Sequence, residues 1–217
     1  MVMLALGAWA FEVARNSITV DGIQDRQYVN AWLAKQQAAL RSGEQSHVYF
    51  YETRNTDTLL QQFVGNAAIE RLTFELTDLS DDGVQIIAEL PRIERLTLYG
   101  GRPRVGDRGI GLLRGHPTLT TLKIVNIDVT DRGLAVLQTL HHLQHLTLCR
   151  HESREKLLTD GAVEELRNLT GLVKLNIVGG WMSPPAIDHL RTLLPGCDVV
   201  VDANWMRDDE QSDPQVR

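Results

Sequence analysis

The sequence predicts an α/β solenoid, with a parallel sheet on the concave face and short helices on the convex face. Four stretches are nearly the same: LSDDGVQII, VGDRGIGLL, VTDRGLAVL and LTDGAVEEL, which begin at Leu79, Val105, Val129 and Leu158. Around each of them, apolar residues recur first at every second position and then at every third. Such a unit cannot bury its apolar face alone, whereas stacked units share one core.

The composition is that of a globular protein. Of its 217 residues, 43% are hydrophobic and 23% are charged, which is typical of a chain that buries a core. The formal net charge of −6 argues against a general nucleic-acid binder. The two cysteines, Cys149 and Cys197, are too few for a disulfide framework and form no CxxC pair. We therefore expect no nucleic-acid partner.

Residues 1–44 are predicted to form an apolar segment followed by a capping helix. The first residues, MVMLALGAWAF, are apolar and uncharged. This run is shorter than the about 20 residues that span a bilayer, and it lacks the basic residues that open a signal peptide. Three interpretations of residues 1–11 remain open: a helix packed on the domain end, the last part of a membrane anchor, or a signal sequence. Over residues 25–41, helical spacing predicts the cap, with Tyr28, Trp32, Leu33 and Leu40 on one face.

Residues 45–201 are predicted to form the solenoid. A degenerate first coil pairs a strand at HVYFYE, residues 47–52, with a helix at TDTLLQQF, residues 56–63. Five repeats follow, which begin at Ile69, Ile93, Leu119, Leu143 and Leu172. A last strand in LLPGCDVVV closes the sheet. After Val201 the chain is acidic and polar, so we expect residues 202–217 to be a disordered tail.

One repeat shows how each coil is built. Leu122 and Ile124 are two positions apart, as in a strand with one buried face. The helical part follows with apolar residues three apart, at Leu134, Leu137 and Leu140. Between them, Thr130 is expected to cap the helix and Asp131 to favour the positive end of its dipole. Ser80 and Thr159 repeat the cap.

These repeats carry a family resemblance. The stretch LTTLKIVNIDVTDRGLAVLQTLHHLQHLTL resembles the leucine-rich repeat family, and its Asn-Ile and T-D-x-G-L segments are similar to the ribonuclease-inhibitor-like, cysteine-containing type. The match covers about residues 69–201 and departs from the pattern through insertions in the second and fourth repeats and through Ser-Pro-Pro-Ala at residues 183–186. The end LLPGCDVVV is similar to bacterial proteins of this type, which often follow a single N-terminal anchor. That resemblance implies that residues 1–11 belong to such an anchor.

Residues between the buried strand positions should point out of the sheet and form a binding face. The outward positions are mildly basic, and the one at the carboxyl end of each strand is partly apolar, with Val178 in the last repeat. Solvated strands need no apolar outward positions, so this column indicates a contact surface. We expect partner binding at Arg71, Arg95, Tyr99, Lys123, Val125, His145 and Lys174.

The loops just past the strand ends form a second candidate site. The insertions YGGRPRV and CRHESREKLL are rich in arginine, and GGWMSPP adds a tryptophan at the equivalent place. Loops on a rigid scaffold often carry binding residues, and Arg and Trp are favoured anchors. The candidates at this loop edge are Arg102, Arg104, Arg150, Arg154 and Trp181.

The sequence contains no pattern typical of an enzyme, a cofactor site or a metal site. It has neither a G-x-S-x-G elbow nor an HExxH motif, and GRPRVGD lacks the Lys-Ser/Thr of a P-loop. The aspartates of the near-copied stretches recur once per coil, which indicates a structural role. The histidines around Cys149 match no strong zinc spacing. We expect no catalysis, no cofactor and no metal.

The sequence thus predicts a leucine-rich-repeat module that binds a protein or peptide on its strand face and loop edge. Two alternatives remain: an architectural domain of a membrane-anchored protein without an exchangeable ligand, and a binder of an acidic polymer through the arginine edge. The location stays open between membrane association and the cytoplasm.

Overall fold

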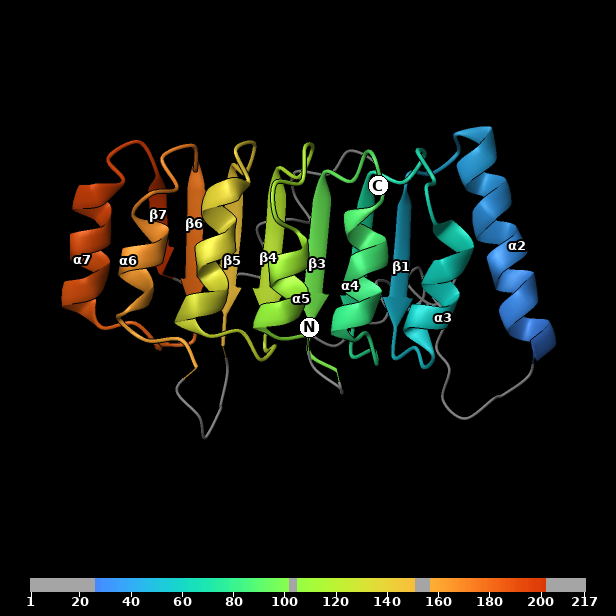
Figure 1. Ribbon diagram of the computed structural model, residues 1–217, viewed down its shortest axis with the longest axis horizontal. Coiled ribbons are helices and arrows are strands. Elements are labelled where there is room, and N and C mark those ends of the chain that lie inside the picture. The colour runs from blue at the N-terminus through green and yellow to red at the C-terminus, as the bar shows by residue number, and fades with distance from the viewer. Residues whose placement is uncertain (1–25, 102–104, 151–156, 202–217) are drawn as a thin grey trace, which may run out of the picture.

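The computed structural model contains one parallel sheet in which the strands follow each other in chain order (Figure 1). It describes residues 26–101, 105–150 and 157–201. Each strand pairs in parallel with the next along the chain, and the same position of each coil stays in register across the sheet. The seven strands are β1 (His47–Tyr51), β2 (Arg71–Glu75), β3 (Arg95–Tyr99), β4 (Thr121–Val125), β5 (His145–Cys149), β6 (Lys174–Val178) and β7 (Asp198–Val201).

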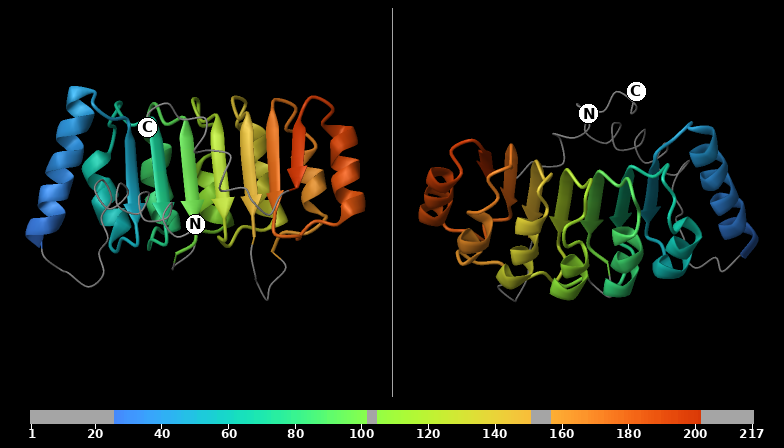
Figure 2. Two further views of the ribbon diagram at one scale, coloured as in Figure 1. Left: turned by 180° about the vertical axis from the view of Figure 1, so that it is seen from behind. Right: turned by 45° about the horizontal axis from the view of Figure 1, so that its top comes forward.

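One helical segment follows each of the first six strands, and these segments cover one face of the sheet (Figures 1 and 2). They are α3 (Thr56–Leu60) with η1 (Gln61–Phe63), α4 (Asp81–Ala88), α5 (Asp107–Leu112), η2 (Asp131–Thr139), α6 (Ala162–Leu166) and α7 (Pro184–Leu193). Helix α2 (Arg26–Ser42) lies at the end of the solenoid next to the first coil. This is the α/β leucine-rich-repeat solenoid with a helical N-terminal cap that the repeats predict.

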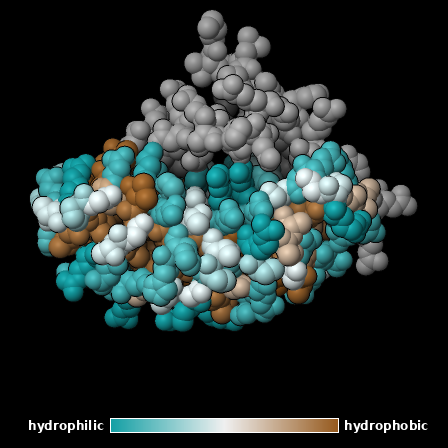
Figure 3. All heavy atoms as spheres, turned by 90° about the horizontal axis from the view of Figure 1, so that it is seen from above, coloured by the Kyte–Doolittle hydropathy of each residue, from teal (hydrophilic) through white to brown (hydrophobic). Residues whose placement is uncertain are grey.

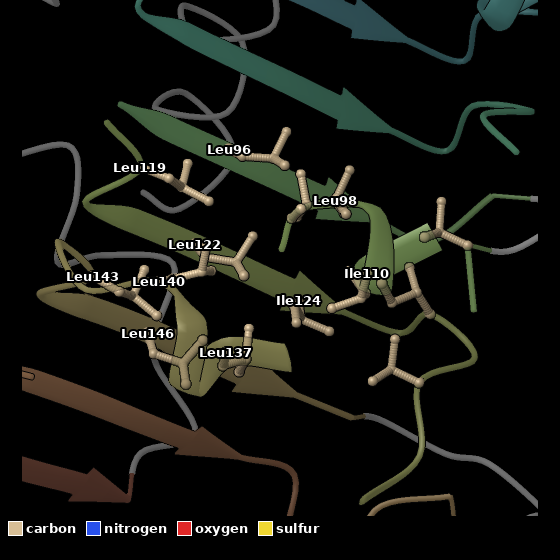
Figure 4. Packing of buried hydrophobic residues seen from close by; sticks show 14 of the residues in the cluster. Leu96, Leu98, Ile110, Leu119, Leu122, Ile124, Leu137, Leu140, Leu143 and Leu146 are labelled. Carbon is tan, nitrogen blue, oxygen red and sulfur yellow. The ribbon is translucent and has the colours of Figure 1, made fainter. Parts of the chain in front are cut away.

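The predicted core positions are buried. Leu122 and Ile124 of β4 point toward the helices, and Leu137 of η2 lies beside them (Figure 4). Leu134 of η2 is buried in the same cluster. Because the strands are in register, equivalent leucines and isoleucines of neighbouring coils stack in continuous rows. Each such side chain contributes roughly 1.5–3 kcal/mol through burial. Leu33 of the cap and Leu193 of α7 are half-buried, and Leu194, the residue after α7, enters the core.

The N-terminal cap is sealed by aromatic rings. Trp32 of α2 is 8% exposed and packs against Phe50 of β1 with ring centroids 5.5 Å apart, and Phe63 of η1 completes the contact. Phe50 in turn stacks on Phe74 of β2 at 5.0 Å. Aromatic pairs at these separations add to the stability gained from area burial. Helix α2 therefore covers the apolar end of the first coil, where no further strand pairs with β1.

The near-copied stretches are explained by an aspartate ladder that joins successive coils. Asp107 accepts the backbone N–H of Thr130 at 2.7 Å and its hydroxyl at 2.6 Å. Equivalent pairs join Asp57 to Ser80, Asp131 to Thr159 and Asp160 to Ser183. Asp81 accepts only the N–H of Gly106 because glycine has no hydroxyl. Each coil thus supplies the carboxylate that binds the helix start of the next.

The glycine of the T-D-x-G segment makes room for this carboxylate. A Cβ atom at Gly133 would lie 2.1 Å from Oδ1 of Asp107. Gly83 and Gly109 stand in the same way against Asp57 and Asp81. A larger side chain at these sites would have to displace a carboxylate that is hydrogen-bonded to the next coil.

The expected capping role of Thr130 is wrong. Its hydroxyl donates to Asp107 and caps no helix, and the following segment is the 3₁₀ helix η2. Ser80 caps α4 as predicted, because its side chain accepts the backbone N–H of Asp82 at 3.1 Å. Thr159 accepts the backbone N–H of Gly161 at 3.0 Å, but Gly161 is the N-cap of α6, so the predicted cap at Thr159 is wrong. Asp131 accepts hydrogen bonds from the next coil, a role that the dipole argument did not predict.

Candidate binding surface

We call the side of the sheet away from the helical segments the strand face. The outward residues of each strand form three rows across it, and in Figure 2 (left) no described helix lies over them. The row at the amino ends of the strands contains His47, Arg71, Arg95, Thr121, His145, Lys174 and Asp198. Figure 3 views the molecule from this edge, where hydrophilic residues predominate.

Four members of the first row make a basic row: Arg71, Arg95, His145 and Lys174. Arg95 and His145 are exposed, and Arg71 and Lys174 are half-buried. Partial burial lowers the pKa of His145, and the positive charges of Arg95 and Lys174 lower it further. The structure therefore places Arg71, Arg95 and Lys174 in one row at the amino ends of the strands, and the lowered pKa of His145 favours its neutral form among them.

The middle row is polar and knits the strands together. Asn176 donates from Nδ2 to Oγ1 of Thr147 at 3.3 Å, and His47 contacts Oγ1 of Thr73 through Nε2 at 3.1 Å. The predicted binding residue Lys123 lies in this row and is half-buried.

At the carboxyl ends of the strands, the third row contains a buried apolar patch formed by Val125, Cys149 and Val178. They are neighbours in register and are exposed to 0%, 2% and 0%. The expectation that Val125 and Val178 are solvent-exposed contacts is wrong, because both pack in a cluster separate from the main core. Burial raises the pKa of the Cys149 thiol to about 12.

Tyr99 borders this apolar patch. It is half-buried and packs against the three patch residues. Its pKa is raised, first by burial and then by the negative charge of Glu75. Tyr99, a predicted binding residue, therefore lies between the apolar patch and Glu75 of β2.

An aromatic and acidic corner lies over β1 and β2 and was not predicted. The hydroxyl of Tyr49 donates to the carboxylate of Glu75, and burial with this hydrogen bond raises the pKa of Tyr49. Tyr51 follows two positions later on the same face, with its ring centroid 6.2 Å from that of Tyr49. The outward positions were inferred from the five repeats that begin at Ile69, so the prediction did not include β1. The alternation in HVYFYE was the signal that would have added His47, Tyr49 and Tyr51.

The loop edge differs from its prediction at Arg150. This side chain is 7% exposed, and its Nη1 donates to the carbonyl of Ile127 at 3.0 Å. Gly179 packs so closely that a Cβ there would lie 1.8 Å from the carbonyl oxygen of Arg150. Arg150 therefore joins neighbouring coils, and the expectation that it is a solvent-exposed anchor is wrong. Trp181 is half-buried against the core, and Arg102, Arg104 and Arg154 lie outside the described residues.

The described residues offer no metal site and no membrane span. Among them, no three His, Cys, Asp or Glu side chains are placed to hold a metal ion. No helix within the same ranges is long and apolar enough to cross a membrane. Residues 1–11, on which the anchor interpretation depends, lie outside those ranges.

No protein-family model matches the sequence, and no curated protein matches it either. The solved tropomodulin C-terminal domain from Caenorhabditis elegans is similar with a TM-score of 0.42 and 14% identity, over 76% of this chain and 92% of that one. The TLR13–ssRNA13 complex is similar with a TM-score of 0.44 and 18% identity, over 71% of this chain and 25% of that one. These likenesses are distant, so the fold is assigned from the strand order and register of the chain itself.

Proposed function

We propose that the protein is a binding module whose strand face receives a protein or peptide chain. One observation carries this proposal: a basic row and an apolar patch lie at opposite ends of the same strands, on a sheet face that no described helix covers. A chain laid along the strands would place acidic side chains opposite the basic row at one end. At the other end it would place apolar side chains beside Tyr99, which borders the buried patch. Arg and Tyr are also the residue types that most often anchor interfaces.

Binding without catalysis is supported by the aspartate ladder. A general acid or base needs a carboxylate free to reach a substrate. Both carboxylate oxygens accept hydrogen bonds from the next coil in Asp107, Asp131 and Asp160. The repeated acids therefore have a structural use that explains their presence.

Residues 1–44, 45–201 and 202–217 are the proposed divisions of the chain. The ribonuclease-inhibitor-like subtype is proposed from the T-D-x-G segments. The N-terminal anchor is proposed from the apolar composition of residues 1–11.

The proposed function is tested by selecting, from a displayed library of random peptides, those that bind the full chain. Arg95→Glu reverses an exposed charge of the basic row, and Arg114→Glu reverses an exposed charge away from the strand face. We expect selected peptides to bind Arg95→Glu about tenfold or more weakly, as for loss of an anchoring arginine, and Arg114→Glu unchanged. Equal binding to both variants would count against the strand face. A selection that enriches no peptide would favour the architectural alternative.

Salt dependence separates this function from recognition of an acidic polymer. Polymer binding weakens steeply with ionic strength because many exposed charges act together. Burial of Arg150 removes one charge from the proposed arginine edge, which disfavours that alternative. Binding of a selected peptide should respond to Tyr99→Ala as well as to salt.

A further inference from the structure

The apolar patch raises a question that the described elements do not answer. Val125 and Val178 are completely buried and Cys149 nearly so, although they point away from the helices. No helix or strand among the described residues lies over that part of the strand face. Side chains on a bare sheet face keep part of their surface in water, so burial to this extent calls for a covering layer.

The chain itself leaves the sheet beside this patch. Val201 at the end of β7 is paired with Ile177, so the residue after it stands next to Val178. Trp205 follows four residues later and Met206 five. Four extended residues span at most about 14 Å, and Cys149 lies two strand spacings, about 10 Å, from β7. A tryptophan and a methionine are therefore within reach of the patch.

The next residues match the charge of the same face. Asp208, Asp209 and Glu210 follow the two apolar residues after a single basic residue, Arg207. The basic row begins at the other end of strands that are about 13 Å long, and Lys174 and His145 belong to the two strands nearest β7. Seven extended residues reach about 25 Å from Val201, which is enough to bring these carboxylates opposite the row.

We propose that the segment after Val201 folds back over the strand face, with Trp205 and Met206 on the apolar patch and the acidic residues 208–210 opposite the basic row. The apolar segment of residues 1–11 is the rival occupant, but it carries no acidic side chain to match Arg95 and Lys174. The C-terminal segment would then act as an internal ligand that any partner must displace.

Reactivity of Cys149 tests this directly. With Cys197→Ala, Cys149 is the single thiol of the full chain. In that background, we expect Trp205→Ser with Met206→Ser to raise the rate of reaction with a disulfide reagent about tenfold or more under native conditions, since local opening controls access. Leu4→Ser with Trp9→Ser is the matched control and should leave the rate unchanged. An unchanged rate in the first variant, or an increase in the control alone, would overturn the proposal.

A second measurement places the segment without removing its apolar residues. Asn204→Cys, in the same Cys197→Ala background, should form an intramolecular disulfide with Cys149 when oxidised glutathione is the oxidant, whereas Gln215→Cys should not. Failure of Asn204→Cys to cross-link would contradict the proposal even if Cys149 is protected. Neither measurement uses a partner, so a failed peptide selection would leave this inference standing.

Discussion

At the scale of single residues, the T-D-x-G segment combines two requirements that look alike in sequence. The aspartate serves the coil that follows, whereas the glycine makes space for the aspartate of the coil before. A sequence pattern shows that both recur but does not show that they contact residues of different coils. The ladder is thus a property of stacking.

Gly133→Ala tests this use of space. The new methyl group would force the Asp107 carboxylate from its two bonds to Thr130. We expect the free energy of unfolding to fall by about 1–3 kcal/mol in urea denaturation. Gly111→Ala is the control, because nothing lies within 4 Å of its added Cβ and it sits in a helix, where alanine is favoured. Equal losses in both variants would show that the loss in Gly133→Ala does not come from the aspartate ladder.

At the scale of the elements, the sequence predicted the order of strands and helices, but neither the helix type of η2 nor the contact of Arg150. Apolar spacing located strands β2 to β6 and the capping helix because burial of one face imposes that spacing. It did not distinguish the 3₁₀ helix η2 from an α-helix, since both bury the same apolar positions. The sequence also placed Arg150 in a solvated loop. Nothing in the insertion indicates that the Arg150 side chain donates a hydrogen bond to the carbonyl of Ile127 in the neighbouring coil.

The core role of β4 gives a second prediction. Leu122 is completely buried between β3 and β5. Leu122→Ala should lower the free energy of unfolding by about 2–5 kcal/mol through lost burial and a residual cavity. Val173→Ala, at a residue 54% exposed, should stay within about 0.5 kcal/mol of the parent. Urea denaturation compares them, and a loss below about 1 kcal/mol for Leu122→Ala would contradict the assigned register.

At the scale of the whole molecule, stability should depend on pH through a histidine buried between coils. His116 is 4% exposed, and its Nε2 lies 3.1 Å from the carbonyl of Leu90 in the preceding coil. Its Nδ1 has no hydrogen-bond partner among the described residues. Burial lowers the pKa of His116, and the hydrogen bond to Leu90 offsets this only in part. A proton on Nδ1 would add a buried charge with no acceptor beside it.

The sign of the effect follows from that lowered pKa. The unfolded chain takes up the proton first, so the contribution of His116 is fully present above the ordinary value of about 6.5 and is lost as the pH falls through the lower folded value. Urea denaturation at about pH 7.5 and about pH 5.5 should show a loss that is smaller in His116→Gln than in the parent. Since His145 titrates in both proteins, their difference isolates His116. An identical loss in both would sink this assignment.

The aspartate ladder also bears on how such a chain could arise. Every coil with a Ser or Thr at its helix start and an aspartate next to it carries both an attachment for the coil before and one for the coil after. A segment of DNA that encodes one such coil, copied in tandem, would fit its neighbours on either side without changes to them. The coil is therefore the unit that duplication can add or remove.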